Sequence, residues 1–159
     1  MSKAHVITIS DGAFNGKRED ASGQALVSVL GRGGFEVGGP EVVPDDVERI
    51  REAVMTAVER GVDLVVATGG TGLGPRDVTP QAMATLIDYE VPGLGEAMRR
   101  AGAESTPMAV LSRSMGGVRK RTLIISVPGS PKGAIESLKA VMPVVGHAIE
   151  LLHGETTHT

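Results

Sequence analysis

Apolar runs of strand length alternate along the chain with stretches that repeat at helical spacing. The short apolar runs predict strands at residues 6–9, 35–43, 63–67 and 123–127. The helical periodicity predicts helices at residues 22–30, 46–60, 80–87 and 94–103, and a last one from residue 130 onward. The clearest helix is 46–60, in which Val47, Ile50, Val54 and Val58 recur on one face and Gly61 follows the end.

Two prolines interrupt this pattern. Gly38-Gly39-Pro40 falls inside the second strand, and because proline cannot donate to a strand ladder, we expect that strand at a sheet edge or bulged. Pro143 falls inside the last helix, where it removes one hydrogen bond and clashes a turn back, so we expect a kink or a split. The apolar stripe of that helix comprises Ile135, Leu138, Met142, Val145, Ile149 and Leu152.

The order of these elements predicts the fold class. Alternating strands and helices favour an α/β domain with a mainly parallel sheet and helices on both faces. The apolar residues are chiefly Val, Ile, Leu, Ala and Met, which suit buried parallel strands. A length of 159 residues is normal for one domain, so we expect a single domain over residues 1–154 and a loose tail at 155–159.

Composition excludes several classes of function. The absence of cysteine excludes disulfides, thiolate nucleophiles and sulfur-ligated metals. A net charge of −3, the lack of a basic run and the scarcity of aromatic residues argue against nucleic-acid binding. No apolar stretch approaches membrane-spanning length and no signal-peptide pattern opens the chain. We therefore expect no membrane association and a cytoplasmic location.

Three turns that follow predicted strands carry the candidate chemistry. Ligands of open α/β sheets bind beyond the carboxyl ends of the strands, which is where these turns should meet. The three turns are Ser10-Asp11-Gly12, residues 68–77, and Pro128-Gly129-Ser130-Pro131-Lys132-Gly133.

The second turn is the most informative. Its glycines let a ligand approach bare backbone amides, which form anion-binding concavities in such turns. Thr79 and Pro80 are expected as the N-cap and first residue of the next helix, whose positive end favours phosphate. The alternative is a tight strand-to-helix connection with no ligand. The candidate binding residues are Gly69, Gly70, Thr71, Gly72 and Gly74.

The third turn repeats this arrangement. Gly129 frees the backbone and Ser130 is expected to cap the last helix. Lys132 in the first helical turn suggests an anion held nearby, although a solvated lysine explains it equally well. Arg113 lies between these turns, and Arg119, Lys120 and Arg121 cluster just before the last strand. An arginine fork suits a phosphate or a carboxylate, although a solvated basic edge is the commoner meaning of such residues.

Three aspartates accompany these anion-binding features. Asp77 lies in a loop that attracts anions, which a magnesium ion carried by a nucleotide would reconcile. Asp45 precedes the strongest helix, and with Glu48 it is close to a capping box, so capping alone could explain it. Asp11 is a weaker candidate of the same kind, because Asp-Gly is a common turn pair.

Together these residues resemble the Mog/MoaB family of molybdenum-cofactor biosynthesis proteins over nearly the whole chain. The most specific match is Thr68-Gly-Gly-Thr-Gly-Leu-Gly-Pro-Arg-Asp-Val-Thr-Pro80. Further matches are Thr8-Ile-Ser-Asp-Gly12, residues 20–23, Val43-Pro44-Asp45, residues 90–96, Thr106-Pro107, Leu111-Ser-Arg113, Thr122-Leu-Ile and Pro128-Gly-Ser-Pro-Lys132.

The resemblance implies a three-layer α/β domain, a homotrimer, and molybdopterin adenylyltransferase activity. Such enzymes transfer AMP from magnesium-ATP to the terminal phosphate of molybdopterin and release pyrophosphate. It implies Asp45 and Asp77 as catalytic residues, here also expected to hold Mg²⁺, and Ser112 in the pterin-binding region. It also implies that the glycine loop and the turn with Gly129, Ser130 and Lys132 bind ligand. Asp11 and Gly12 match a loop at the same pocket.

Two other functions stay open from the sequence. The first is a non-catalytic protein that binds molybdopterin and delivers it to a molybdenum insertase, against which the intact Asp45 and Asp77 argue. The second is a nucleotide-processing hydrolase built on a related competence-protein domain, which would be expected with a fused second domain. The retained Arg-Asp-Val-Thr-Pro pattern favours the active transferase.

Overall fold

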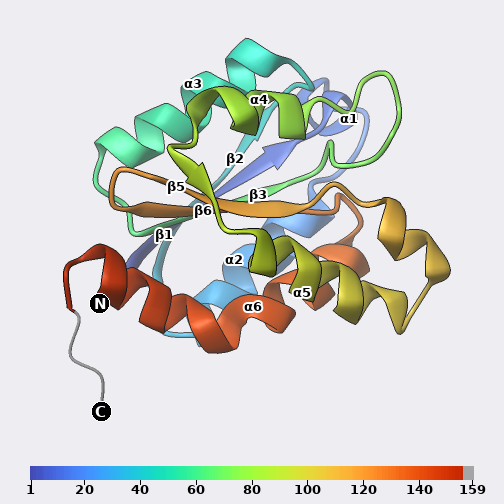
Figure 1. Ribbon diagram of the computed structural model, residues 1–159. Coiled ribbons are helices and arrows are strands. Elements are labelled where there is room, and N and C mark those ends of the chain that lie inside the picture. The colour runs from blue at the N-terminus through green and yellow to red at the C-terminus, as the bar shows by residue number, and fades with distance from the viewer. Residues whose placement is uncertain (156–159) are drawn as a thin grey trace.

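A six-stranded sheet forms the centre of the computed structural model, which describes residues 1–155 (Figure 1). The strands are β1 (Lys3–Ile9), β2 (Glu36–Val43), β3 (Leu64–Thr68), β4 (Tyr89–Glu90), β5 (Met115–Arg119) and β6 (Thr122–Val127). Their order is β2-β1-β3-β6-β5-β4. The pairs among β2, β1, β3 and β6 are parallel, and β5 pairs antiparallel with both β6 and β4. The expected mainly parallel sheet is confirmed.

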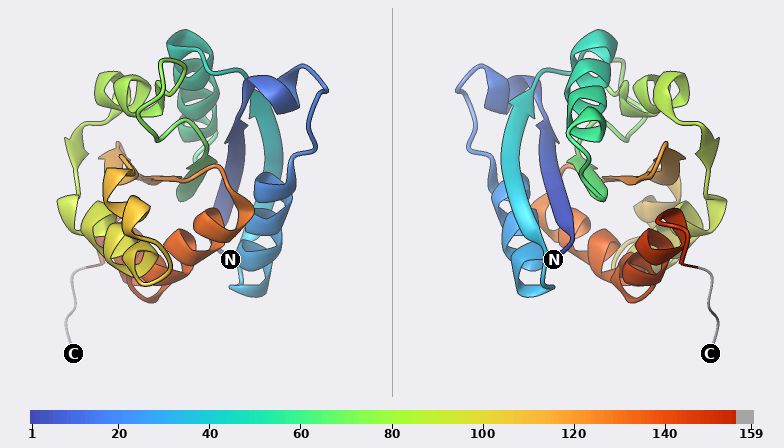
Figure 2. Two further views of the ribbon diagram at one scale, coloured as in Figure 1. Left: turned by 90° about the vertical axis from the view of Figure 1, so that its right-hand side faces the viewer. Right: turned by 90° about the vertical axis from the view of Figure 1, so that its left-hand side faces the viewer.

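Helices cover both faces of this sheet. They are α1 (Asp11–Phe14), α2 (Ala21–Arg32), α3 (Val47–Glu59), α4 (Thr79–Leu86), α5 (Pro92–Ala103), a 3₁₀ helix η1 (Pro107–Leu111) and α6 (Pro131–Leu152). Helices α3 and α4 lie on one face, and α2, α5 and α6 lie on the other (Figures 1 and 2). This arrangement is the three-layer α/β fold that the sequence predicts.

Two apolar clusters hold the layers together, one on each face. The first joins α2, α5 and α6 to residues such as Val6, Val66 and Ile125, and the second joins α3 and α4 to Ile7 and Val65. Alternate residues of one strand thus serve opposite clusters, because successive strand side chains point to opposite faces. Every residue of β3 is buried, so the centre of the sheet is a rigid base for the loops at its ends.

The predicted helices and strands are all present, with ends within three residues of those expected. Elements α1, β4, β5 and η1 were not predicted. Strand β5 contains Gly116 and Gly117, which weaken strand propensity in the sequence. A Cβ at Gly116 would collide with Leu94 and one at Gly117 would lie 3.1 Å from Ile87, so close packing explains both glycines.

The predictions for the two prolines differ in how they compare with the structure. Strand β2, with Pro40, lies at a sheet edge, and its register with β1 shifts between His5 and Ile7, as expected. Pro143 does not split α6, which is continuous. Pro143 has no N–H to donate to the carbonyl oxygen of Lys139, one helical turn earlier. Both residues are exposed, so water can hydrate that carbonyl instead. Meanwhile the opposite, buried face of α6 stays packed on the sheet.

Two further expectations concern the C-terminal tail and membrane-spanning helices. Of the expected loose tail, residues 156–159 lie outside the described residues. Within the part of the chain that the structure describes, no helix is both long and apolar enough to cross a membrane.

Candidate functional site

The three predicted turns meet at one edge of the sheet. Strand register brings the ends of the parallel strands level, with Ile9 beside Val43 and Thr68 beside both Thr8 and Val127. The turns also touch: a Cβ on Gly129 would lie 3.3 Å from the Cα of Gly69. The expectation that ligand-binding turns converge at the strand ends is therefore met in the geometry.

Two cavities open beside these turns, one of about 590 Å³ and one of about 480 Å³. Both are lined by Gly70, Asp77, Gly129 and Ser130. The cavities are therefore neighbours that share a wall made of the glycine loop and the turn before α6. Two small molecules of moderate size could occupy them side by side, with Asp77 reaching both.

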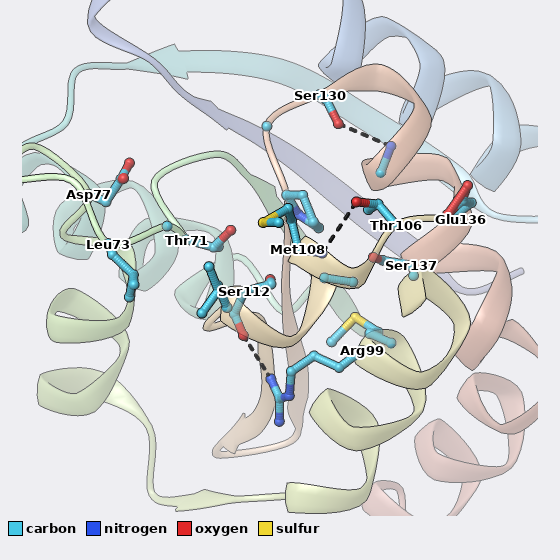
Figure 3. A pocket seen from close by; sticks show the side chains of 18 of the residues that line it. Thr71, Leu73, Asp77, Arg99, Thr106, Met108, Ser112, Ser130, Glu136 and Ser137 are labelled. Carbon is cyan, nitrogen blue, oxygen red and sulfur yellow. Dashed lines mark hydrogen bonds between the residues drawn. The ribbon is translucent and has the colours of Figure 1, made fainter. Parts of the chain in front are cut away.

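The larger cavity lies between the glycine loop and helices α5 and α6 (Figure 3). Thr71, Leu73 and Asp77 lie on one side, and Glu136 and Ser137 of α6 lie across from them (Figure 3). Apolar atoms from α5 and η1 complete the lining, including those of Met98, Met108 and Leu111. Of the residues predicted to bind ligand, this cavity contains Gly70, Thr71, Gly72, Ser112, Gly129 and Ser130.

The smaller cavity lies between β1, β3 and the starts of α2 and α6. The side chains of Asp20 and Ser130 cap these helices, accepting from the amides of Gly23 at 2.9 Å and Gly133 at 3.1 Å. The predicted cap at Ser130 is thus confirmed. Helix starts carry partial positive charge, which favours anionic groups. Of the predicted residues, this cavity contains Asp45, Gly69, Gly70, Asp77, Gly129 and Ser130.

Gly69 and Gly70 cannot be replaced without strain. Their φ angles are +109° and +67°, in the region that favours glycine. A Cβ on Gly69 would collide with the carbonyl oxygen of Ile9, and one on Gly70 with Oγ1 of Thr79. The glycines therefore allow the loop to turn tightly over the end of β1.

The role predicted for Thr79 is wrong. The N-cap of α4 is Val78, which makes no capping side-chain bond, and Thr79 is the first helical residue. Thr79 is buried, and its hydroxyl donates to the carbonyl oxygen of Gly69 at 2.8 Å. Its side chain therefore fastens the glycine loop to the helix instead of capping the helix.

The capping explanation for Asp45 is also wrong. The N-cap of α3 is the next residue, Asp46, whose carboxylate accepts from the amide of Arg49 at 3.0 Å. Asp45 instead exchanges two bonds with Asp11: each amide donates to the other's carboxylate at 2.9 Å. This pairing fixes Asp45 at the wall of the smaller cavity, although a functional use of its carboxylate remains a prediction.

Charge around Asp45 is unbalanced. Burial raises the pKa of the Asp45 carboxyl above its ordinary value, and the charges of Asp11 and Asp77 add to the rise. In contrast, a hydrogen bond from Arg76 lowers the pKa of Asp11, helped by the amide of Asp45. Arg76 binds Asp11 through Nε at 3.0 Å and Nη2 at 3.2 Å. Among residues 1–155, no cationic side chain lies within hydrogen-bond distance of the Asp45 carboxylate, which accepts from the amide of Asp11.

Asp77, like Asp45, is a half-buried carboxylate that lines the smaller cavity. Its Oδ2 accepts from the amide of Gly74 at 2.9 Å. The described residues contain no group of three His, Cys, Asp or Glu side chains that could hold a metal ion. Asp45 and Asp77 could supply two oxygen ligands, and a divalent cation would need further oxygens from a bound phosphate.

Four predicted binding residues line neither of these cavities: Asp11, Gly12, Gly74 and Lys132. Two of them bond residues that do line a cavity: the amide of Asp11 donates to the carboxylate of Asp45, and the amide of Gly74 donates to that of Asp77. Gly12 lies within α1. Lys132 is exposed in the first turn of α6, which favours the alternative of a solvated lysine.

Several lining residues escaped prediction. Arg99 of α5 donates to the carbonyl oxygen of Ser112 at 3.3 Å (Figure 3) and to that of Ser114 at 2.7 Å. Glu136 and Ser137 come from α6, one turn beyond its start. No sequence signal marks these three, because polar residues on helices usually face water. Asp20 did carry a signal, as part of the matched residues 20–23 that precede α2.

A comparison with protein families identifies the domain. Residues 5–147 match the family described as "Probable molybdopterin binding domain". In structure, the chain is similar to the molybdopterin biosynthesis enzyme MoaB of Thermus thermophilus, with a TM-score of 0.90 and 50% identity. That match covers 97% of this chain and 98% of the other.

Two curated relatives differ in length from each other. The chain is 38% identical over 151 residues to the molybdenum cofactor biosynthesis bifunctional protein of Synechococcus elongatus, covering 95% of this chain but only 47% of that protein. It is 38% identical over 155 residues to the molybdopterin adenylyltransferase of Helicobacter pylori J99, covering 94% of this chain and 86% of that enzyme. The chain thus spans about half of the bifunctional relative and most of the adenylyltransferase.

Proposed function

Because the chain belongs to the molybdopterin-binding domain family of the Mog and MoaB proteins, we propose that it is a molybdopterin adenylyltransferase. The reaction transfers AMP from ATP to the terminal phosphate of molybdopterin and releases pyrophosphate. The observation that carries the proposal is the pair of neighbouring cavities with a shared wall of Gly70, Asp77, Gly129 and Ser130.

Adenylyl transfer needs two anionic substrates held next to each other. An oxygen of the pterin phosphate attacks the α-phosphorus of ATP, and the bond from that phosphorus to the oxygen bridging to the β-phosphate breaks. Positioning and charge neutralisation supply most of the rate enhancement in such reactions. Adjoining cavities would place the two phosphates together at the shared wall. The start of α6 at Ser130 supplies partial positive charge at this wall, and the start of α2 at Asp20 supplies it in the smaller cavity.

The donor set fits a magnesium ion that arrives with the nucleotide. Two carboxylates are the usual protein contribution where substrate phosphates complete the coordination. The pKa of Asp45 is raised by burial and by neighbouring carboxylates. A divalent cation would offset this electrostatic cost of ionising the carboxyl group. Asp45 and Asp77 would hold this ion. When bound, Mg²⁺ neutralises charge that develops on the phosphates.

Paired substitutions test the assignment. We expect Asp45→Asn and Asp77→Asn each to lower adenylyl transfer about 100-fold or more, as for lost electrostatic stabilisation. Binding of molybdopterin should stay within about threefold, because Ser112, which the family resemblance places in the pterin-binding region, lines the larger cavity and is unchanged in both variants. Asp46→Asn serves as the control, since Asp46 caps α3 and lines neither cavity. Turnover of both variants equal to that of the wild type would contradict the catalytic assignment of Asp45 and Asp77. A wild type that binds molybdopterin but shows no turnover would favour the delivery protein.

Three further features remain part of the proposal. The resemblance supports a homotrimer and a cytoplasmic location, and sedimentation of the purified chain would test the former. A molybdenum insertase would consume the adenylylated product. A hydrolase would instead cleave ATP or a pyridine nucleotide without pterin, and an assay lacking pterin separates it from the transferase.

A further inference from the structure

Arg113 binds the glycine loop instead of facing a cavity. Its Nε and Nη2 donate to the carbonyl oxygen of Gly72 at 3.0 and 2.7 Å. Nη2 also donates to the carbonyl oxygen of Asp77 at 2.8 Å. The amide of Arg113 donates to the carbonyl oxygen of Thr71 at 2.8 Å. One residue therefore holds both limbs of the loop that carries Asp77.

The loop has few other attachments to the rest of the chain. Bonds from Asp77 to Gly74 lie within the loop, and Thr79 and Gly69 bond each other at its base. Outside contact near the tip comes from Arg76, which is 69% exposed where it meets Asp11. Exposed ion pairs contribute little, so Arg113 is the stronger anchor.

The position of Arg113 also links the two parts of the site. The preceding residue, Ser112, lines the larger cavity, while Asp77 lines both. A displacement of Asp77 by about 1 Å can cost about 100-fold in rate when groups must be aligned. A lysine would not suffice, because its single nitrogen cannot reproduce the two-nitrogen bond that Nε and Nη2 make to the carbonyl of Gly72.

We infer that Arg113 is a positioning residue for adenylyl transfer: it fixes the glycine loop and thereby sets the carboxylate of Asp77. This inference rests on the proposed function. Arg113 itself lines neither cavity, and its guanidinium acts through the backbone of Gly72 and Asp77.

Two variants and a matched control test this. Arg113→Ala and Arg113→Lys remove the fork, and Arg51→Ala removes an arginine that also donates to a carbonyl, that of Thr85 at 2.7 Å, but lines neither cavity. Hydrogen exchange measured by mass spectrometry reports on the loop without any substrate. We expect faster exchange at residues 71–78 in both Arg113 variants, unchanged exchange in β3, and a loop like the wild type in Arg51→Ala.

Kinetics then test the role in the reaction. We expect kcat of both Arg113 variants to fall about 10- to 100-fold, with KM for ATP and molybdopterin within about threefold. The Mg²⁺ concentration for half-maximal activity should rise, because Asp77 is misplaced. Methylguanidine should restore part of the activity of Arg113→Ala, and methylammonium should not. A general loss of structure would lower the active fraction without changing the Mg²⁺ dependence.

The outcomes separate this inference from the proposed function. Unchanged exchange at residues 71–78, or a loosened loop with wild-type kcat, would overturn the positioning role. A wild-type chain that transfers no AMP would overturn the proposed function and the catalytic part of this inference. In that case faster loop exchange in Arg113→Ala would still support the structural anchor.

Discussion

The substitution Gly70→Ala probes how the glycine loop is held over the strand ends. Gly70 has a φ of +67°, and a Cβ there would collide with Oγ1 of Thr79 and lie 3.2 Å from Oδ1 of Asp45. Gly16 offers the matched control, because it has a φ of +72° with nothing within 4 Å of a built Cβ. The two substitutions share the backbone penalty and differ only in the collision.

The magnitudes follow from these contacts. The positive φ costs about 1–2 kcal/mol for alanine at either position. At Gly70 the collision also displaces the Thr79 hydroxyl from the carbonyl of Gly69, a bond contributing about 1 kcal/mol, and overpacking adds about 1–3 kcal/mol. Gly70→Ala should therefore lower the free energy of unfolding by about 2 kcal/mol or more beyond Gly16→Ala.

Urea unfolding followed by far-ultraviolet circular dichroism suits this chain, which has no Trp and one Tyr. A shift of the midpoint at constant m-value reports a change in stability alone. If Gly70→Ala and Gly16→Ala differ by less than about 0.5 kcal/mol, the collision with Thr79 does not occur and the described loop geometry is wrong.

Three further predictions concern stability. The pKa of Asp45 is raised in the folded protein, so ionisation of its carboxyl group opposes folding. Asp45→Asn should therefore be more stable than the wild type near neutral pH. In thermal unfolding, this difference in stability should vanish as the pH falls below the ordinary pKa of a carboxyl group. Asp46→Ala loses the cap of α3 and should cost about 1 kcal/mol in urea unfolding. Ser130→Ala should cost about 1 kcal/mol for the same reason at α6, and equal midpoints for variant and wild type would show that this cap is unimportant.

The strand-end location of the site could be predicted from the sequence. Parallel strands place their carboxyl ends at one edge, so the turns with Ser10, Gly69 and Gly129 had to converge. The family resemblance is confirmed by the match over residues 5–147. Both predictions depend on features that are local in sequence: apolar runs, glycines and short motifs.

Other features depend on contacts that sequence spacing does not encode. Asp45 and Asp46 are adjacent and both can cap a helix, so only the fold shows that Asp46 caps and Asp45 pairs with Asp11. The interpretation of Arg113 as a phosphate or surface residue missed its true acceptors, which are carbonyls about 40 residues away in the chain.

The unpredicted antiparallel strands have a similar cause. Strand β5 forms because its glycines admit Leu94 and Ile87, which belong to other segments. The cavity wall from α5 and α6 likewise arises from helix packing, since Arg99 and Glu136 resemble ordinary solvent-facing helical residues in the sequence.

The central claim is most directly tested by analysing the products of the wild-type chain with ATP, Mg²⁺ and molybdopterin by mass spectrometry. The account predicts one pyrophosphate for each adenylylated pterin formed, and none of either product when the divalent ion is chelated. Retention of unmodified pterin without pyrophosphate release, or cleavage of ATP with no pterin adduct, would contradict it.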